Sequence, residues 1–363
     1  MKIPSAPLVA AWYVAAFTLS MVATLWLTPI AGRVARRLDL MDNPSDSKIH
    51  KQPTPYLGGM AVAGGLVLVA GVAAGASGQL LTVLLGGLAV AVLGLADDSN
   101  AVGPWAKLLF EMAAGFALWM AGVRATLFDV TALDLFVTVL WVVAITNAVN
   151  LLDNMDGVSS GTTAIAALTF FALAAERGDY LVGSFALALA GASLGFLRHN
   201  LPPAKIFLGD AGSLLAGFLL ASLGLKLDLI GKGHVVRAAI PVLILAVPIF
   251  DTMLVMVARL RDRRPMFRGG TDHSSHRMSR LGFSDRSVAI VAYGLQVACC
   301  GLAVWLLHTS SLTAMEVVGG VAILWVALLI FLLSVREIPP SPAEVGQTAL
   351  PPATLDSPVI ERL

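Results

Sequence analysis

Five short clusters of carboxylates, amides, lysines and histidines interrupt an otherwise apolar sequence. They lie at 48–55, with Gly58 and Gly59 behind it, and at 97–100, 147–157, 205–213 and 271–277. Carboxylate oxygens bind Mg²⁺, and lysine, arginine and amide groups bind phosphate oxygens. These residue types in combination predict phosphoryl-group transfer, a reaction that depends on positioning and charge neutralisation.

The cluster at 147–157 has the most regular spacing. Asn147, Asn150 and Asp153 are three residues apart, and Asp156 continues the same period. Residues at this spacing lie along one side of a helix, so the end of an apolar helix would carry a polar stripe. The alternative is that the amides only form hydrogen bonds between helices.

Two further clusters place acids at helix ends. Asp97 and Asp98 end an apolar stretch, where the helix dipole disfavours negative charge. A divalent cation or Lys107, one turn before Glu111, would compensate them. Asp210 lies between glycines at the start of another stretch, where free N–H groups bind phosphate and an acid can hold Mg²⁺. A solvated acidic loop for the pair and a plain N-cap for Asp210 are the alternatives.

His273 and His276 lie three residues apart in the loop that is richest in arginine. No thiolate or third histidine accompanies them, so a polyanion suits this loop better than zinc. Asp251 and Glu111 lie within apolar segments, which makes them candidates for supporting roles. For Asp251 we expect an arginine of this loop as the partner.

The elements that must carry these clusters are membrane spans. The 363 residues are 57% hydrophobic and 13% charged, with a mean hydropathy of +0.83; soluble domains have about 25% charged residues. A span needs roughly 20 apolar residues, and about eleven stretches satisfy this. They lie near 8–31, 57–76, 79–96, 105–122, 133–152, 161–176, 180–198, 212–227, 235–258, 288–308 and 313–334. We predict an all-α polytopic membrane domain at 1–336 and a Pro-rich disordered tail at 337–363.

The lysines and arginines set the orientation, because basic residues are retained on the cytoplasmic side. With the N-terminus outside, the outer basic residues are only Lys2, Arg124, Arg177, Lys226, Lys232 and Arg237. An odd number of spans then places the C-terminus and all five clusters on the cytoplasmic side. A transporter would more often carry ionisable groups at the bilayer midplane and two matched halves, which the sequence does not suggest.

In order and type, the clusters resemble the motifs of the polyprenyl-phosphate N-acetylhexosamine-1-phosphate transferases, glycosyltransferase family 4. The matching pieces are Pro53-Thr54-Pro55 with Gly58-Gly59, Asp97-Asp98, the run from Asn147 to Gly157, Phe207 to Ser213, and the loop of His273 and His276. The resemblance extends from about Asp42 to Leu281. It implies an eleven-span helical fold, a UDP-amino sugar and polyprenyl phosphate as substrates, Mg²⁺ with Mn²⁺ as a substitute, and UMP as a product.

Roles for single residues follow from this resemblance. Asp97, Asp98 and Asp210 resemble the catalytic acids, with the first two facing the lipid phosphate. Asp210 and Asp153 resemble the Mg²⁺ ligands. The expected substrate-binding residues are Asn150, Asp153 and Asp156 around the nucleotide, Phe207 beside uracil, and Lys48, Lys51, Lys107, His273 and His276 on phosphate oxygens. The expected supporting residues are Asn147, Glu111 and Asp251.

Two positions depart from the family pattern. Asn154 stands where the family usually has glycine, and Ser275 stands where many relatives have a further histidine. Peptidoglycan translocases carry three consecutive histidines here, so their absence favours the branch that uses GlcNAc-1-phosphate and undecaprenyl phosphate. We therefore predict the first membrane step of a cell-envelope polysaccharide pathway, in the plasma membrane with a cytoplasmic active site. The alternatives are phospho-MurNAc-pentapeptide transfer and transport of a nucleotide sugar or lipid-linked sugar; no nucleic-acid partner is expected, and a homodimer is left open.

Overall fold

The computed structural model describes residues 6–42, 52–99, 102–128, 130–227, 229, 233–266 and 270–335. Its helices are α1 (Ala6–Arg37), α2 (Gly58–Gly75), α3 (Gly78–Ser99), α4 (Pro104–Met120), α5 (Thr131–Leu152), α6 (Val158–Glu176), α7 (Tyr180–Asn200), α8 (Gly209–Lys226), α9 (His234–Ile244), α10 (Ala246–Arg261), α11 (Ser274–Arg280), α12 (Asp285–Leu306) and α13 (Ser311–Ser334). Two short strands, β1 (Met41–Asp42) and β2 (Thr54–Pro55), pair antiparallel. Lys48, Lys51 and the predicted tail at 337–363 lie outside the described residues.

The helices are those of an all-α polytopic membrane protein. Among the described residues, seven helices are long and apolar enough to cross a membrane, or eight if the bent pair of α9 and α10 is one span. The other apolar stretches predicted from the sequence are also helical, but they are shorter or less apolar. For example, α4 has 17 residues, against the roughly 20 that a perpendicular span needs. The larger number of spans stays a prediction.

The stretch at 235–258 is divided into two helices that meet at an angle of 80°. Pro248 has no N–H to donate to the carbonyl four residues earlier, which is that of Ile244, and its ring crowds that carbonyl. The side chain of Gln296 in α12 supplies the missing donor, because its Nε2 lies 2.5 Å from the Ile244 oxygen. The bend therefore has an identifiable cause and a side chain that satisfies it.

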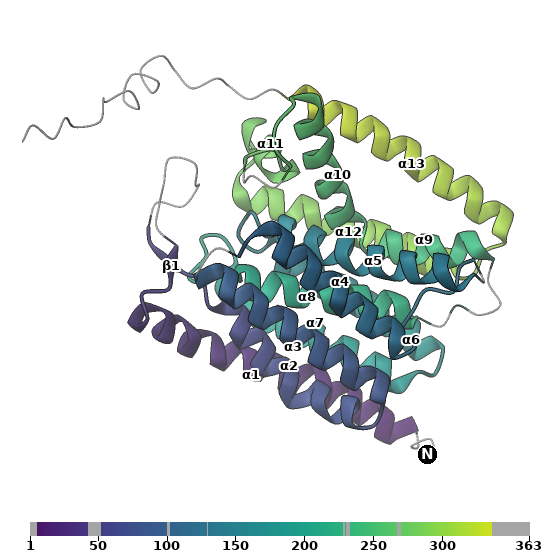
Figure 1. Ribbon diagram of the computed structural model, residues 1–363, viewed down its shortest axis with the longest axis horizontal. Helices are drawn as coiled ribbons and strands as arrows, with labels where there is room; N and C mark the ends of the chain where they lie inside the picture. Colours follow the sequence, from purple (N-terminus) through teal and green to yellow (C-terminus); the bar gives the residue numbers. More distant parts are fainter. Residues whose placement is uncertain are drawn as a thin grey trace, which may run out of the picture.

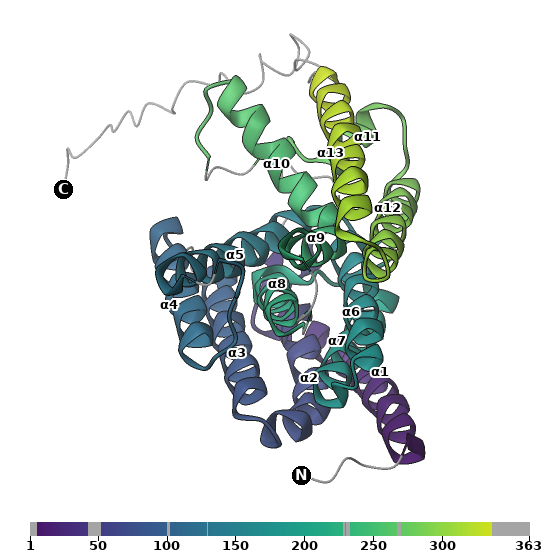
Figure 2. The ribbon, with the colours of Figure 1, turned by 90° about the vertical axis from the view of Figure 1, so that its right-hand side faces the viewer.

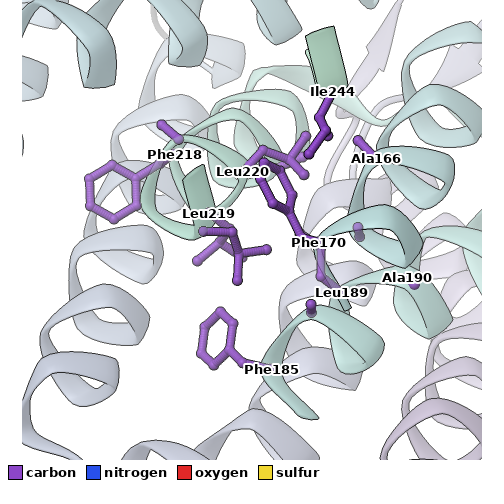
Figure 3. Packing of buried hydrophobic residues seen from close by; sticks show 14 of the residues in the cluster. Ala166, Phe170, Phe185, Leu189, Ala190, Phe218, Leu219, Leu220 and Ile244 are labelled. Carbon is purple, nitrogen blue, oxygen red and sulfur yellow. The ribbon is translucent and has the colours of Figure 1, made fainter. Parts of the chain in front are cut away.

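Helix α8 lies at the centre of the bundle. Figure 2 shows it viewed nearly along its axis, with α2, α3, α5, α6, α7 and α9 around it. Every residue from 211 to 223 is buried. Figure 3 shows Phe218 of α8 in the same core as Phe170 of α6 and Phe185 of α7. Because lipid is as apolar as these side chains, close packing rather than exclusion from water holds such helices together.

Small residues allow two helices to approach the beginning of α8 at backbone distance. A Cβ added to Gly59 of α2 would lie 2.1 Å from the backbone nitrogen of Gly212. A Cβ added to Gly94 of α3 would lie 2.4 Å from the carbonyl oxygen of Asp210. Side chains at either position would push these helices apart, so both glycines fix the point where α2, α3 and α8 meet.

The outer helices expose apolar surface. Only 6% of the best apolar window of α13 and 17% of that of α1 are buried. In Figure 1, α13 (yellow) and α1 (purple) lie on opposite sides of the bundle. Side chains such as Trp26, Leu312 and Ile323 are about seven-tenths exposed, which suits a surface that contacts lipid.

Candidate active site

Acids from three helix ends meet at one end of the bundle. Asp97 and Asp98 come from the last turn of α3, Asp153 is the residue at which α5 ends, and Asp210 lies in the first turn of α8. We call these four residues the acidic cluster. The positions are far apart in the sequence, and the packing of α3 and α5 against α8 brings them together.

Lys107 joins two members of the acidic cluster. Its Nζ lies 2.7 Å from Asp97 Oδ2 and 2.7 Å from Asp210 Oδ2. The other carboxylate oxygen of Asp97 accepts a hydrogen bond from the N–H of Val102 at 2.6 Å. Lys107, one of the two cations expected to compensate the pair of acids, therefore lies beside Asp97. Asp210 has a side chain that is 31% exposed against 17% for Asp97, so it is the more accessible to a substrate.

Asp98 caps the beginning of α8. Its two oxygens accept hydrogen bonds from the N–H groups of Asp210, at 2.9 Å, and Ala211, at 3.1 Å. Gly209, with φ at +71°, makes the turn that points these groups toward α3 and adopts a conformation that glycine favours. The positive end of the α8 dipole and these two hydrogen bonds favour the charged form of Asp98, against its burial, and the N–H groups are engaged by Asp98. The cap comes from another helix and not from Asp210, and the role of Asp98 at the lipid phosphate stays a prediction.

The predicted polar stripe of α5 exists, and its members bond to neighbouring helices. Asn150 Nδ2 donates to Asp210 Oδ1 and to Ser213 Oγ, each at 2.9 Å. One turn earlier, Asn147 Nδ2 donates to Oε2 of Glu111 in α4, whose side chain is buried. Asn150 therefore orients a member of the acidic cluster, whereas Asn147 holds two helices together near it.

Asp153 lies where burial and neighbouring acids both disfavour its negative charge. Burial, followed by the carboxylates of Asp210, Asp98 and Asp156, raises its pKa well above the ordinary value. Among the described residues, Lys107 is the cation that bonds directly to the acidic cluster. Carboxylate and amide oxygens are hard ligands of the kind that Mg²⁺ prefers, so the chemistry of the donors fits this ion. Within the part of the chain that the structure describes, however, no three His, Cys, Asp or Glu side chains are grouped so as to hold a metal ion.

The loop before α8 is held from several sides. Asp156 Oδ2 accepts a hydrogen bond from the N–H of Ala204 at 2.7 Å. The N–H of Phe207 donates to the carbonyl of Pro55 at 2.8 Å, and its own carbonyl accepts from the N–H of Gly58 at 3.1 Å. The first and fourth sequence clusters are thus in direct contact. Phe207, three residues before Asp210, has a half-buried side chain.

His273 is oriented by a buried carboxylate. Its Nδ1 lies 2.8 Å from Asp251 Oδ2, and Asp251 Oδ1 accepts from the N–H of Ser274 at 2.7 Å and from its hydroxyl at 2.6 Å. The prediction that Asp251 pairs with an arginine of this loop was wrong among the described residues. The carboxylate lies at the first turn of α11, where a helix N-terminus and a histidine both favour its charged form.

The arginines of this loop bond to Asp272 and to α13. Asp272 pairs with Arg259 at 3.3 Å and with Arg264. Burial alone would raise the pKa of Asp272, but hydrogen bonds and charge from the two arginines lower it below the ordinary value. Arg277 donates to the carbonyls of Leu332, at 2.9 Å, and Val335, at 3.0 Å. Arg259, Arg264 and Arg277 are therefore held by other groups of the protein.

His276 lies beside His273, with the ring centroids 5.7 Å apart. Burial, followed by the neighbouring His273, lowers the pKa of His276 to about 4. This imidazole is therefore neutral at physiological pH, so any contact with a phosphate would be a hydrogen bond from a neutral ring.

Three contacts near the site were not predicted. Ser275 Oγ donates to Oδ1 of Asn154, so the two departures from the family pattern touch each other. Asn200 accepts from the N–H of Gly157 at 3.0 Å and donates to the carbonyl of Ile206 at 3.1 Å. The signal for such residues is an amide in or beside an apolar helix, which must find a partner in another segment.

The comparisons with known proteins agree with the motifs. A family model described as glycosyl transferase family 4 matches residues 80–228, a range that contains the whole acidic cluster. The chain is 34% identical over 292 residues to a Bacillus subtilis (strain 168) protein named probable undecaprenyl-phosphate N-acetylglucosaminyl 1-phosphate transferase, covering 77% of this chain and 81% of the relative.

Two other proteins with similar sequences carry related names. The decaprenyl-phosphate N-acetylglucosaminephosphotransferase of Mycolicibacterium smegmatis is 30% identical over 364 residues, covering 89% of this chain and 88% of the relative. A phospho-N-acetylmuramoyl-pentapeptide-transferase of Synechococcus elongatus is 32% identical over 233 residues, covering 58% of this chain and 63% of the relative. The similarity to the first of these covers nearly the whole chain.

Proposed function

The chain belongs to glycosyl transferase family 4, and on this premise we propose that it transfers GlcNAc-1-phosphate from UDP-GlcNAc to a polyprenyl phosphate, with release of UMP. The relatives named for this activity in Bacillus and Mycolicibacterium support the reaction. The observation that carries it to this chain is the acidic cluster, in which Asp210 bonds to both Lys107 and Asn150 at one end of the bundle. Such a group of acids with one amine and one amide suits a diphosphate and its divalent cation.

The transfer is a single displacement in this proposal. An oxygen of the lipid phosphate forms a bond to the β-phosphorus of the UDP-sugar, and the bond from that phosphorus to the bridging oxygen breaks. The bridging oxygen leaves with UMP. A phosphate monoester has its second pKa near 6, so at neutral pH the nucleophile is already largely deprotonated. Asp97, whose two oxygens are engaged by Lys107 and Val102, therefore serves to position groups and not as an obligatory base.

In this proposal different residues of the site bind different parts of the substrates. Asp210 and Asp153 would hold Mg²⁺, which when bound neutralises charge on the diphosphate. Asn150 and Lys107 orient Asp210 through the contacts described above. Phe207 and Asp156 would bind the nucleoside end, and His273 and His276 the sugar-phosphate end. Lys48 and Lys51 would add positive charge on the cytoplasmic side.

The membrane topology belongs to the same proposal. We place the N-terminus outside, the C-terminus and the acidic cluster at the cytoplasmic face of the plasma membrane, and about eleven spans across it. This places the site where UDP-sugars are available and beside the leaflet that holds the lipid phosphate. Phospho-MurNAc-pentapeptide transfer is the second candidate, because the Synechococcus relative carries that name.

The experiment uses purified full-length protein in detergent with Mg²⁺, undecaprenyl phosphate and either sugar-labelled UDP-GlcNAc or UDP-MurNAc-pentapeptide. We expect equimolar UMP and labelled lipid from UDP-GlcNAc, and neither product from Asp210→Asn. Ser310→Ala is the matched control, because Ser310 caps α13 through the N–H of Thr313 and takes no part in the acidic cluster. Labelled lipid from the muramyl substrate alone would establish the second candidate, and absence of UMP with both substrates would refute phosphoryl transfer.

A further inference from the structure

Asn154 follows Asp153 of the acidic cluster directly, and its side chain reaches the other half of the site. Its Oδ1 accepts a hydrogen bond from Ser275 Oγ. Its Nδ2 donates to Asp251 Oδ2 at 3.5 Å and to the carbonyl of Leu151 at 2.8 Å. One amide thus contacts the end of α5, the buried acid of α10 and the first turn of α11.

Two of the residues that Asn154 contacts belong to the histidine segment, residues 272–276, or bind it: Ser275 is part of the segment, and Asp251 forms hydrogen bonds to it. Asp251 is fully buried and bonds to Nδ1 of His273 and to the N–H and hydroxyl of Ser274. Ser275 has 3% of its surface exposed and His273 has 5%. Substitution of Asn154 would therefore remove hydrogen-bond partners from Asp251 and Ser275, which are buried and cannot replace them with water.

The same region of the molecule also contains an apolar contact. Met278 of α11 packs against a small cluster that contains Leu152, Met155 and Val288. It joins the end of α5, the loop after it, α11 and α12. This contact keeps the histidine segment near the acidic cluster, but apolar packing has little directional preference. Hydrogen bonds and ion pairs therefore orient the segment: those of Asp251 and Asn154, and those of Asp272 with Arg259 and Arg264.

The amide is suited to this position because it offers an acceptor and a donor together. Ser275 requires the acceptor, and the carboxylate of Asp251 requires the donor. Alanine would supply neither, and a carboxylate would place like charge beside Asp251. Asn154 thus satisfies one partner that donates a hydrogen bond and one that accepts a hydrogen bond.

We propose that Asn154 is a positioning residue that fastens the histidine segment to the acidic cluster through Ser275 and Asp251, so that both halves of the site grip the diphosphate of the UDP-sugar together. The role in substrate binding rests on the proposed function; the fastening itself does not. In this proposal the polyprenyl phosphate reaches the site from the membrane, and its binding does not depend on Asn154.

The test is a double-mutant cycle with Asn154→Ala, Ser275→Ala and the double variant in full-length protein. Ser279→Ala is the matched control, because its hydroxyl donates to the carbonyl of Ser275 within α11 and does not reach Asn154. Amide hydrogen exchange of the peptides that cover 270–281 reports the fastening, and steady-state kinetics report its use.

We expect faster exchange at 270–281 in both single variants and an exchange rate in the double variant equal to that of Asn154→Ala. The KM for the UDP-sugar should rise about tenfold in Asn154→Ala, as expected for loss of a hydrogen bond to a charged group, while the KM for polyprenyl phosphate stays at the wild-type value. Ser279→Ala should match the wild type in both measurements.

Wild-type exchange in both single variants would overturn the proposal, and so would additive effects in the double variant. An equal rise of both KM values, with faster exchange, would also overturn it, because that pattern indicates general loss of structure. If the wild type releases no UMP, the proposed function fails, and the exchange data still decide whether Asn154 fastens the segment.

Discussion

Asp98 allows a test between two roles. The structure shows it capping α8, whereas the sequence predicts that it contacts the lipid phosphate. It accepts hydrogen bonds from the N–H groups of Asp210 and Ala211. A helix cap contributes about 0.5–2 kcal/mol, and a charged acceptor makes a hydrogen bond about twice as strong as a neutral one. Removing both bonds in Asp98→Ala should therefore cost about 3 kcal/mol. Asp98→Asn keeps one acceptor and should cost about 1–2 kcal/mol.

These energies convert into rates if the loss falls on the placement of Asp210. Since 1.4 kcal/mol corresponds to about tenfold, kcat should fall about 100-fold in Asp98→Ala and about tenfold in Asp98→Asn. The assay is initial UMP release at saturating substrates, with thermal unfolding of each variant in detergent alongside. Ser310→Ala removes a cap from α13 and should lower stability without lowering kcat.

The ordering of the variants decides between the two roles. A cap predicts a graded loss in which Asp98→Asn is clearly more active than Asp98→Ala. If both variants are as inactive as Asp210→Asn, Asp98 contacts the reacting groups directly, and the reasoning from the α8 cap is refuted.

Three further predictions follow from single contacts. Asp97→Asn should keep nearly full activity above pH 8 while Asp210→Asn is inactive, measured as UMP release against pH; an equal loss at every pH would contradict the positioning role of Asp97. Gln296→Leu leaves the Ile244 carbonyl without its donor at the bend and should lower unfolding stability by about 1–3 kcal/mol, whereas wild-type stability would contradict that role. Because the pKa of His276 is lowered to about 4, the folded state prefers the neutral ring, so its contribution is fully present above the unfolded pKa of about 6.5 and is lost as the pH falls toward 4. His276→Gln should lose less stability than the wild type between pH 6.5 and 4.5, and identical slopes would contradict this assignment.

The helices and the meeting of the clusters were predictable from the sequence for simple reasons. Apolar stretches of spanning length form helices in a membrane, and the polar clusters lie at the ends of such stretches. The period of three at Asn147, Asn150 and Asp153 also predicted a stripe on one side of α5, which the structure confirms. The length and apolar composition of a stretch do not by themselves show whether its helix crosses the membrane.

The contacts that depend on the approach of two backbones were not predictable. Asp98 becomes a cap because Gly94 lets α3 reach the beginning of α8. Asp251 pairs with His273 because α10 leaves α9 at 80° and passes the start of α11. Proline at 248 signals a bend, but its direction is set by packing that a single sequence does not encode locally.

The most direct measurement uses UDP-GlcNAc that carries ³²P in the β-phosphate, incubated with purified protein, undecaprenyl phosphate and Mg²⁺. Transfer of the sugar with its phosphate predicts that the label appears in the lipid fraction and that the released nucleotide is unlabelled UMP. Labelled UDP in the aqueous fraction, with sugar but no label in the lipid, would mean that the bond between sugar and phosphate is broken instead, and would contradict phosphoryl transfer at the acidic cluster.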